Sequence, residues 1–150
     1  MLKYTLIPDS FFSESAAREL LSQVVILEEN DTVKSLELPC YKAVLLYAGD
    51  DADAQRLSGM LSAAAGLDRY NKVVVHQGPS AVDIVIAAGE KLLLCNSYPA
   101  SDPVTAQYFL FSALHQFQIN PEVTTVHFFG EADETVKGDL FRHFASVEVL

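Results

Sequence analysis

The chain has 150 residues, of which 50% are hydrophobic and 20% charged, a balance that supplies one domain's core and excludes a disordered chain. Ten lysines and arginines stand against twenty aspartates and glutamates, so the formal net charge is −10. This charge argues against a protein that binds the phosphates of nucleic acid and against one that binds an anionic membrane, because either kind of binding needs clustered basic side chains. We therefore expect an acidic, soluble domain over residues 1–150.

The start of the chain and its cysteines bear on location. Pro8 and Asp9 interrupt the first apolar residues too early for a secretion signal, and no apolar run approaches the roughly 18 residues of a membrane span. Cys40 and Cys95, without an export signal, favour free thiols over a disulfide. We predict a cytoplasmic location, and Cys40 is typical of a small buried apolar residue.

The first 47 residues predict one helix and two strands. Ser13 is a typical cap for a helix that begins at Glu14. The apolar face of this helix consists of Ala17, Leu20, Leu21 and Val24. Residues 33–38 predict a short strand that Pro39 stops, and residues 41–47 predict a more apolar one.

An acidic turn at residues 50–53 follows that strand. Carboxylates stabilise the first turn of a helix, so the turn is expected to open a helix over residues 54–65, with Gly66 as its C-terminal cap. Residues 72–76 then predict an interior strand, ended by a Gln-Gly-Pro breaker at residues 77–79.

The next elements are a hairpin and a long helix. Residues 81–87 and 91–96 predict two strands joined by a turn in which Gly89 can take a positive φ. Asp102 followed by Pro103 is a strong helix start, and that helix runs to about Gln118. Its apolar stripe comprises Ala106, Phe109, Leu110, Phe111, Ala113, Leu114 and Phe117. A stripe this wide predicts cover on more than one side of the helix.

Three elements complete the chain: a strand over residues 124–129, a helix over 133–144 and a terminal strand over 146–150. Phe128 and Phe129 are neighbours on the strand and face opposite sides, so both sheet faces are expected to be apolar there. The whole pattern predicts an α/β fold, a mixed sheet with helices packed on it.

Several packing and turn positions together resemble an uncharacterised bacterial family whose members have a degenerate actin-like (ribonuclease H-like) ATPase fold. These positions are residues 5–12, 38–47, 93–98, Asp102, Tyr108, Phe109, Leu114, Gln116, Phe117, Asn120, Pro121 and 126–130. Family members carry further sequence before the stretch matched by residues 5–12 and after the last helix. The resemblance therefore implies a partial or shortened actin-like domain.

The resemblance makes nucleotide binding the sharpest chemical hypothesis. Active actin-like ATPases hold phosphates in Asp-x-Gly hairpins, where glycine lets the backbone approach the anion. The hairpin at residues 82–90 offers Asp83 and Gly89, but Val85 stands where close approach needs glycine. The candidate adenosine loop has the single Gly130, followed by a carboxylate. Asp83 is more simply an exposed strand residue or turn partner, and a divergent ATPase or phosphotransferase using this hairpin is the alternative.

Other chemistry has little support in the sequence. The four histidines lie on different predicted elements without metal-ligand spacing: His76, His115, His127 and His143. His127 is interpreted as an outward-facing or hydrogen-bonded strand residue, and His115 and His143 fall on polar helix faces. Cys95 ends a strand a few residues before the helix at Asp102 and is the better candidate for a reactive thiol, but Asp102 would raise the pKa of a neighbouring thiol. We predict no catalytic residue, no metal and no cofactor.

The aromatic residues around the helix start at Asp102 supply the leading functional hypothesis, a non-catalytic domain that binds a protein partner or assembles with itself. They are Tyr98, Tyr108, Phe109 and Phe111. If strands of the fuller family pattern are missing here, the sheet has an unpaired edge, and such an edge favours pairing with a second copy as a dimer. Repulsion between two copies of charge −10 opposes this dimer. A small-molecule sensor with a pocket between sheet and helix is a third possibility.

Overall fold

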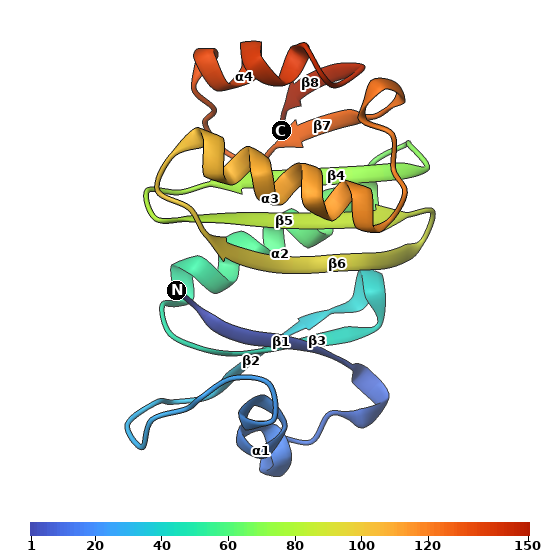
Figure 1. Ribbon diagram of the computed structural model, residues 1–150. Helices are drawn as coiled ribbons and strands as arrows, with labels where there is room; N and C mark the ends of the chain where they lie inside the picture. The colour runs from blue at the N-terminus through green and yellow to red at the C-terminus, as the bar shows by residue number, and fades with distance from the viewer. The chain divides into compact units, whose positions relative to one another are not determined.

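The computed structural model describes residues 1–150 and divides into two compact units, Met1–Ser62 and Ala63–Leu150. Each unit has its own sheet (Figure 1). The division falls within one continuous helix, α2 (Asp51–Gly66). The division into compact units does not test whether residues 1–150 fold as a single domain, and that statement stays a prediction.

The first unit is a three-stranded antiparallel sheet with a short helix. Its strands are β1 (Lys3–Pro8), β2 (Lys34–Leu38) and β3 (Ala43–Ala48), with β3 in the centre. Alternate residues of β3 share a core with Leu21 of α1 (Ala17–Ser22): Val44, Leu46 and Ala48. Apolar alternation on the central strand therefore places the helix on one face of this sheet.

Several predictions for this unit are wrong at the level of single residues. Ser13 caps no helix: its hydroxyl lies 2.9 Å from that of Ser15, the next residues form a 3-10 turn, and α1 begins only at Ala17. Val24 lies beyond α1 and is exposed. The helix has only six residues, too short for capping and periodicity to fix its position against the sheet.

Cys40 is exposed, not buried as predicted. It lies in a 3-10 turn over Pro39–Tyr41, and Lys42 then takes a left-handed conformation with φ 50°. The strand predicted over residues 41–47 therefore begins two residues later, as β3. Strand β1 was not predicted at all, because its six residues are half-buried or exposed and show no clean alternation.

The acidic turn opens α2 as expected, although the helix begins at Asp51 and not at Ala54. The Asp50 carboxylate accepts a hydrogen bond of 2.7 Å from the backbone N–H of Ala52. Gly66 is the last residue of the helix. No helix of the structure combines the length and the apolar character needed to cross a membrane.

The second unit contains the mixed sheet that the sequence predicts. Its strands are β4 (Asn71–Gln77), β5 (Ala81–Ala88), β6 (Lys91–Pro99), β7 (Thr125–Phe128) and β8 (Ser146–Val149). They are ordered β6-β5-β4-β7-β8, with β4, β5 and β6 an antiparallel meander and β7 parallel to both of its neighbours. Gly89 has φ 59° in the β5–β6 turn, which confirms the predicted hairpin.

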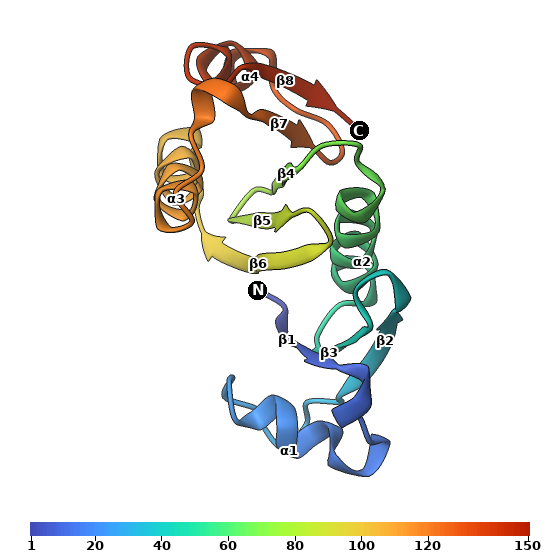
Figure 2. The ribbon, with the colours of Figure 1, turned by 90° about the vertical axis from the view of Figure 1, so that its right-hand side faces the viewer.

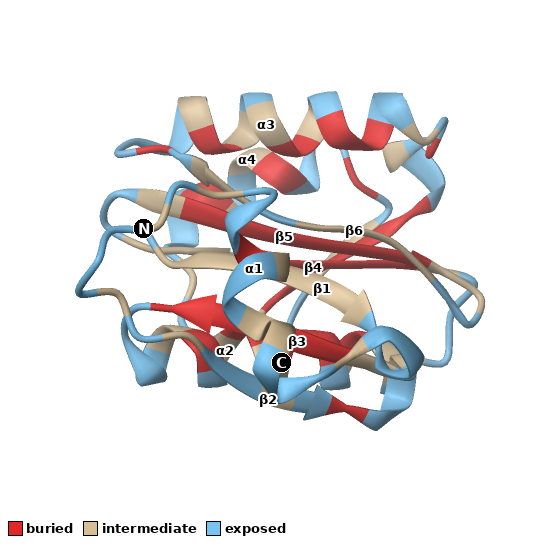
Figure 3. Cartoon of the chain, turned by 90° about the horizontal axis from the view of Figure 1, so that it is seen from below, coloured by how far each residue is buried: buried red, intermediate tan, exposed pale blue.

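One face of this sheet carries two helices, α3 (Pro103–Gln116) and α4 (Glu134–Phe141) (Figure 2). The buried residues of α3 form a stripe along its sheet-facing side (Figure 3). Phe109 stacks on Tyr98 of β6 with ring centroids 4.7 Å apart, and Phe111 stacks on Phe144 at 5.6 Å. These contacts widen the covered part of the helix beyond its sheet-facing stripe, whereas Val104 and Tyr108 of the same helix are exposed.

Strand β7, which lies inside the sheet between β4 and β8, is buried on both faces. Phe128 belongs to the core shared with α3 and α4, and His127, which alternates with it, is fully buried on the opposite face. Phe129 follows the strand and is half-buried, so the expectation that it supplies the apolar opposite face is wrong. Burial on both faces is the arrangement expected of a strand inside a sheet rather than at its edge.

Asp102→Ala is expected to lower the melting temperature by about 2–4 °C at neutral pH, as loss of a helix cap does in a domain of this size. The Asp102 carboxylate accepts hydrogen bonds from the backbone N–H and the hydroxyl of Thr105, both at 2.8 Å. The backbone bond from Thr105, followed by the hydroxyl bond, holds the pKa of Asp102 below its usual value.

A group with a lowered pKa stabilises the fold above the pKa it has in the unfolded chain, and this stability is lost as the pH falls through the folded pKa. The melting temperatures of wild type and Asp102→Ala should therefore converge in acid. Thermal unfolding from pH 7 down to pH 2 measures this. A difference that persists undiminished in acid would assign Asp102 another role.

Candidate functional site

Asp83, the candidate carboxylate if a nucleotide binds, lies in a polar row across three strands. The register pairs it with His76 of β4 and Ser97 of β6, so the three side chains share one face. The Ser97 hydroxyl donates a 2.5 Å hydrogen bond to Asp83, and His76 Nδ1 lies 3.5 Å from the other carboxylate oxygen. Asp83 is buried, so its interpretation as an exposed strand residue is wrong.

The structure separates the three residues that are candidates if a nucleotide binds: Asp83, Gly89 and Gly130. Gly89 donates to the Tyr70 carbonyl beside the first residue of β4, whereas Asp83 pairs near the last. Gly130 lies at the Asp83 end, where a Cβ added to it would be 3.7 Å from the His76 ring. A strand of this length spans roughly 20 Å, so Gly89 is distant from both. Val85 is fully buried, which prevents the strand from approaching an anion there.

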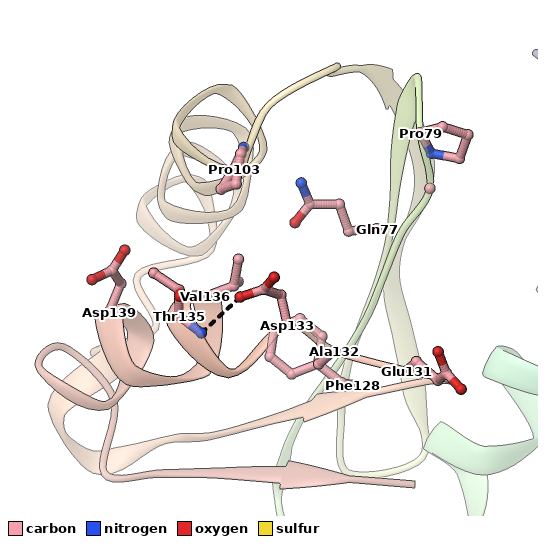
Figure 4. Close-up of a pocket in the computed structure, with 11 residues that line it drawn as sticks. Gln77, Pro79, Pro103, Phe128, Glu131, Ala132, Asp133, Thr135, Val136 and Asp139 are labelled. Atoms are coloured by element: carbon pink, nitrogen blue, oxygen red, sulfur yellow. Dashed lines mark hydrogen bonds between the residues drawn. The ribbon is translucent and has the colours of Figure 1, made fainter.

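A pocket of about 430 Å³ opens at the ends of β4 and β7 (Figure 4). Its lining comes from the β4–β5 turn, the first residue of α3, the end of β7 and the loop and first turns of α4. The lining residues are Gln77, Gly78, Pro79, Pro103, Phe128, Glu131, Ala132, Asp133, Thr135, Val136 and Asp139. Because β4 and β7 are parallel, their carboxyl ends meet at this pocket, the usual position of ligand sites in such sheets.

The charged side chains of the pocket all have one sign. Glu131, Asp133 and Asp139 line it, and no lysine, arginine or histidine does. Asp133 caps α4 by accepting a 2.7 Å hydrogen bond from the Thr135 N–H, and the Gln77 carboxamide extends into the space above it (Figure 4). The arrangement disfavours a phosphate and favours a cation, since a cleft lined by one sign of charge concentrates its field.

The hairpin at residues 82–90 is the candidate phosphate site from the sequence, whereas the β4–β5 turn, which contributes to the pocket, was not predicted as part of a site. The last two residues of β4 and the first of the turn are His76, Gln77 and Gly78, which have the spacing of Asp-x-Gly with histidine in place of aspartate. This spacing, at the end of a predicted interior strand, is the sequence pattern that could have pointed to the β4–β5 turn as part of a site. A histidine cannot supply the carboxylate of the Asp-x-Gly pattern.

The other histidines lie apart from the pocket. His127 is fully buried, with Nδ1 3.2 Å from the Val73 carbonyl oxygen and Nε2 3.3 Å from Glu148 of β8. The interpretation of His127 as hydrogen-bonded is confirmed; that of an outward-facing residue is wrong. His115 and His143 are exposed, and no three His, Cys, Asp or Glu side chains are grouped closely enough to hold a metal ion.

Comparisons with known proteins agree with the fold and name no activity. Residues 57–146 match the model of a family described as "Protein of unknown function (DUF3822)". A crystal structure from Bacteroides thetaiotaomicron, a protein with actin-like ATPase fold and unknown function, is similar with a TM-score of 0.79 and 21% sequence identity. The match covers 99% of this chain and 65% of that one. No curated protein matches.

Proposed function

Because the chain belongs to the DUF3822 family and has an actin-like ATPase fold, we propose that it is a non-catalytic domain that binds protein, including copies of itself. Its place in the family and its fold leave the activity open. The proposal rests on the composition of the pocket and on an exposed apolar surface of α3.

The pocket composition supports a role without phosphate chemistry. A nucleotide phosphate at the ends of β4 and β7 would meet Glu131, Asp133 and Asp139 with no lysine or arginine to offset them. Asp83 already accepts the Ser97 hydroxyl, and Val85 is buried where the Asp-x-Gly pattern has glycine. Repulsion between like charges disfavours such a complex, whose stability depends on cationic or N–H donors.

We expect ATP and ADP at about 1 mM, with or without Mg²⁺, to leave the melting temperature unchanged and ATP to remain unhydrolysed. A ligand at 100 times its Kd would stabilise the fold by about 2.7 kcal/mol, which thermal unfolding detects easily. The measurements are a thermal-shift titration and phosphate release. A Mg²⁺-dependent shift that Asp83→Ala abolishes would instead support the divergent ATPase or phosphotransferase.

The observation that carries the protein-binding proposal is an apolar surface on α3 and β6, formed by Tyr98, Val104, Tyr108 and Phe109. Val104 and Tyr108, one turn apart, are 77% and 68% exposed. Tyr108 packs edge-on against Phe109 at 5.5 Å, and Phe109 stacks on Tyr98 at 4.7 Å. A partly exposed aromatic cluster of this kind is typical of protein interfaces, where tyrosine contributes much of the binding energy.

Sedimentation of the wild-type chain is expected to show a dimer that tightens as added salt screens the repulsion between copies of charge −10. Val104→Ser with Tyr108→Ser should raise the dissociation constant about tenfold or more, since exposed aromatic anchors dominate interface energies. The matched control is Val123→Ser with Tyr70→Ser, a pair 74% and 73% exposed outside this surface. A monomer at high micromolar concentration in low and moderate salt would exclude self-assembly.

A further inference from the structure

We propose that the pocket at the ends of β4 and β7 binds a small organic cation, a primary amine carried on a short hydrocarbon chain. Its volume of about 430 Å³ lies within the range of small-molecule sites. This proposal is independent of the aromatic surface on α3 and assigns a ligand class to a different place in the second unit.

The floor of the pocket is apolar and firmly held. Phe128 is 2% exposed and Val136 is buried, and both belong to the core under α3 and α4. Pro79, Pro103 and Ala132 complete the apolar part of the lining. Because these side chains are fixed by the core and by proline rings, the cavity exists before a ligand enters, and it favours a hydrocarbon segment.

The rim of the pocket selects the charge of the ligand. Three carboxylates and the Gln77 carboxamide line it, and the one lysine within α4, Lys137, is bound to Glu134 at 2.7 Å outside the lining. The N-termini of α3 and α4 are disfavoured as anion sites, because the carboxylates of Asp102 and Asp133 cap them and each accepts a hydrogen bond from one of the free N–H groups. Asp133 uses one oxygen for this and keeps the other for a ligand donor.

The distribution of the carboxylates distinguishes an organic cation from a metal ion. Calcium and magnesium need several oxygen ligands around one point. Glu131, Asp133 and Asp139 line one cavity, yet no three acidic, histidine or cysteine side chains of the chain are close enough to share one ion. An ammonium group on a flexible chain needs only one or two of these oxygens while its methylene groups cover Phe128 and Val136.

Three probes of equal chain length test the proposal: 1,5-diaminopentane, 1,5-pentanediol and glutarate, followed by amide chemical shifts in NMR at constant ionic strength. The diamine should produce saturable shifts at Gln77, Thr135 and Val136, while the diol and the diacid do not. Inorganic sodium at the same ionic strength should also produce none.

Glu131→Gln with Asp139→Asn should weaken diamine binding about tenfold, the effect of losing two partly exposed charge pairs. Both substitutions keep the shape of the side chain and avoid the helix cap at Asp133. The matched control, Asp68→Asn with Glu90→Gln, removes two exposed carboxylates outside the pocket and should leave the affinity unchanged.

Three results would overturn the proposal: no saturation by the diamine, equal shifts from the diol, or the same loss of affinity in the site variant and in the control. None of these results would change the sedimentation of the chain, so failure here is distinguishable from failure of the protein-binding proposal.

Discussion

Phe128→Ala is expected to lower the free energy of unfolding by about 3–5 kcal/mol, as truncation of a buried phenylalanine does. Phe128 is 2% exposed at the end of β7, in the core between the sheet and the helices α3 and α4. Its loss leaves a cavity that β7 cannot close by moving, because β7 is held by β4 on one side and β8 on the other. Urea unfolding measures the change.

The matched control for this variant is Phe141→Ala. Phe141 is the last residue of α4 and is 54% exposed, so its loss should cost about 0.5 kcal/mol or less. Equal losses in the two variants would contradict the assignment of Phe128 to the core.

Leu46→Ala is expected to lower the free energy of unfolding by about 2–5 kcal/mol, because Leu46 is fully buried in the core of the first unit. The same substitution also tests the prediction that residues 1–150 form one domain. Helix α2 continues across the division between Ser62 and Ala63, so separate unfolding of the units would have to break this helix. We therefore expect a single unfolding transition, shifted as a whole.

Hydrogen exchange read separately at β3 and β7 provides the measurement. In one cooperative domain, Leu46→Ala lowers protection in both strands by the same free energy, as Phe128→Ala does. The exposed residue Ile26, changed to alanine, is the control and should lower neither. Loss of protection at β3 alone would show two independently stable units.

The second unit could be predicted well because its decisive signals are local. Asp102 and Pro103 fix the start of α3 within two residues, and Gly89 fixes the β5–β6 turn through its positive φ. The apolar runs of β4 and β5 are buried from one side chain to the next, which makes these strands recognisable without knowledge of their partners.

The first unit was harder to predict because its elements depend on distant partners. β1 is a strand because it pairs with β3, about forty residues further along the chain, and its own residues are only half-buried. Cys40 is exposed because Pro39–Tyr41 turns before β3, a change of direction that neighbouring apolar residues did not indicate. Strand propensity is a weak guide where tertiary pairing decides.

The candidate site shows the same limit. Asp83 has the sequence context of an exposed strand residue, and its burial follows from the register that places Ser97 opposite it. The pocket is lined by segments that are spread over the sequence from Gln77 to Asp139. Its uniform negative charge therefore arises only when the folded sheet brings these segments together. Sequence spacing does not reveal such a combination.

The order β6-β5-β4-β7-β8 also bears on how fast the second unit folds. The meander β4–β5–β6 closes through turns of a few residues, whereas β7 must return across β5, β6 and α3 to pair with β4. Closing a long loop costs chain entropy before the contacts between the two strands form and compensate for that cost. Pairing of parallel strands is therefore slow. We expect the meander to form early and the arrival of β7 to set the folding rate, an order that pulsed hydrogen exchange would detect as protection in β5 before β7. Until β7 arrives, Val73 and Val75 of β4 lack their partner strand, and this intermediate is the form of the chain most exposed to aggregation.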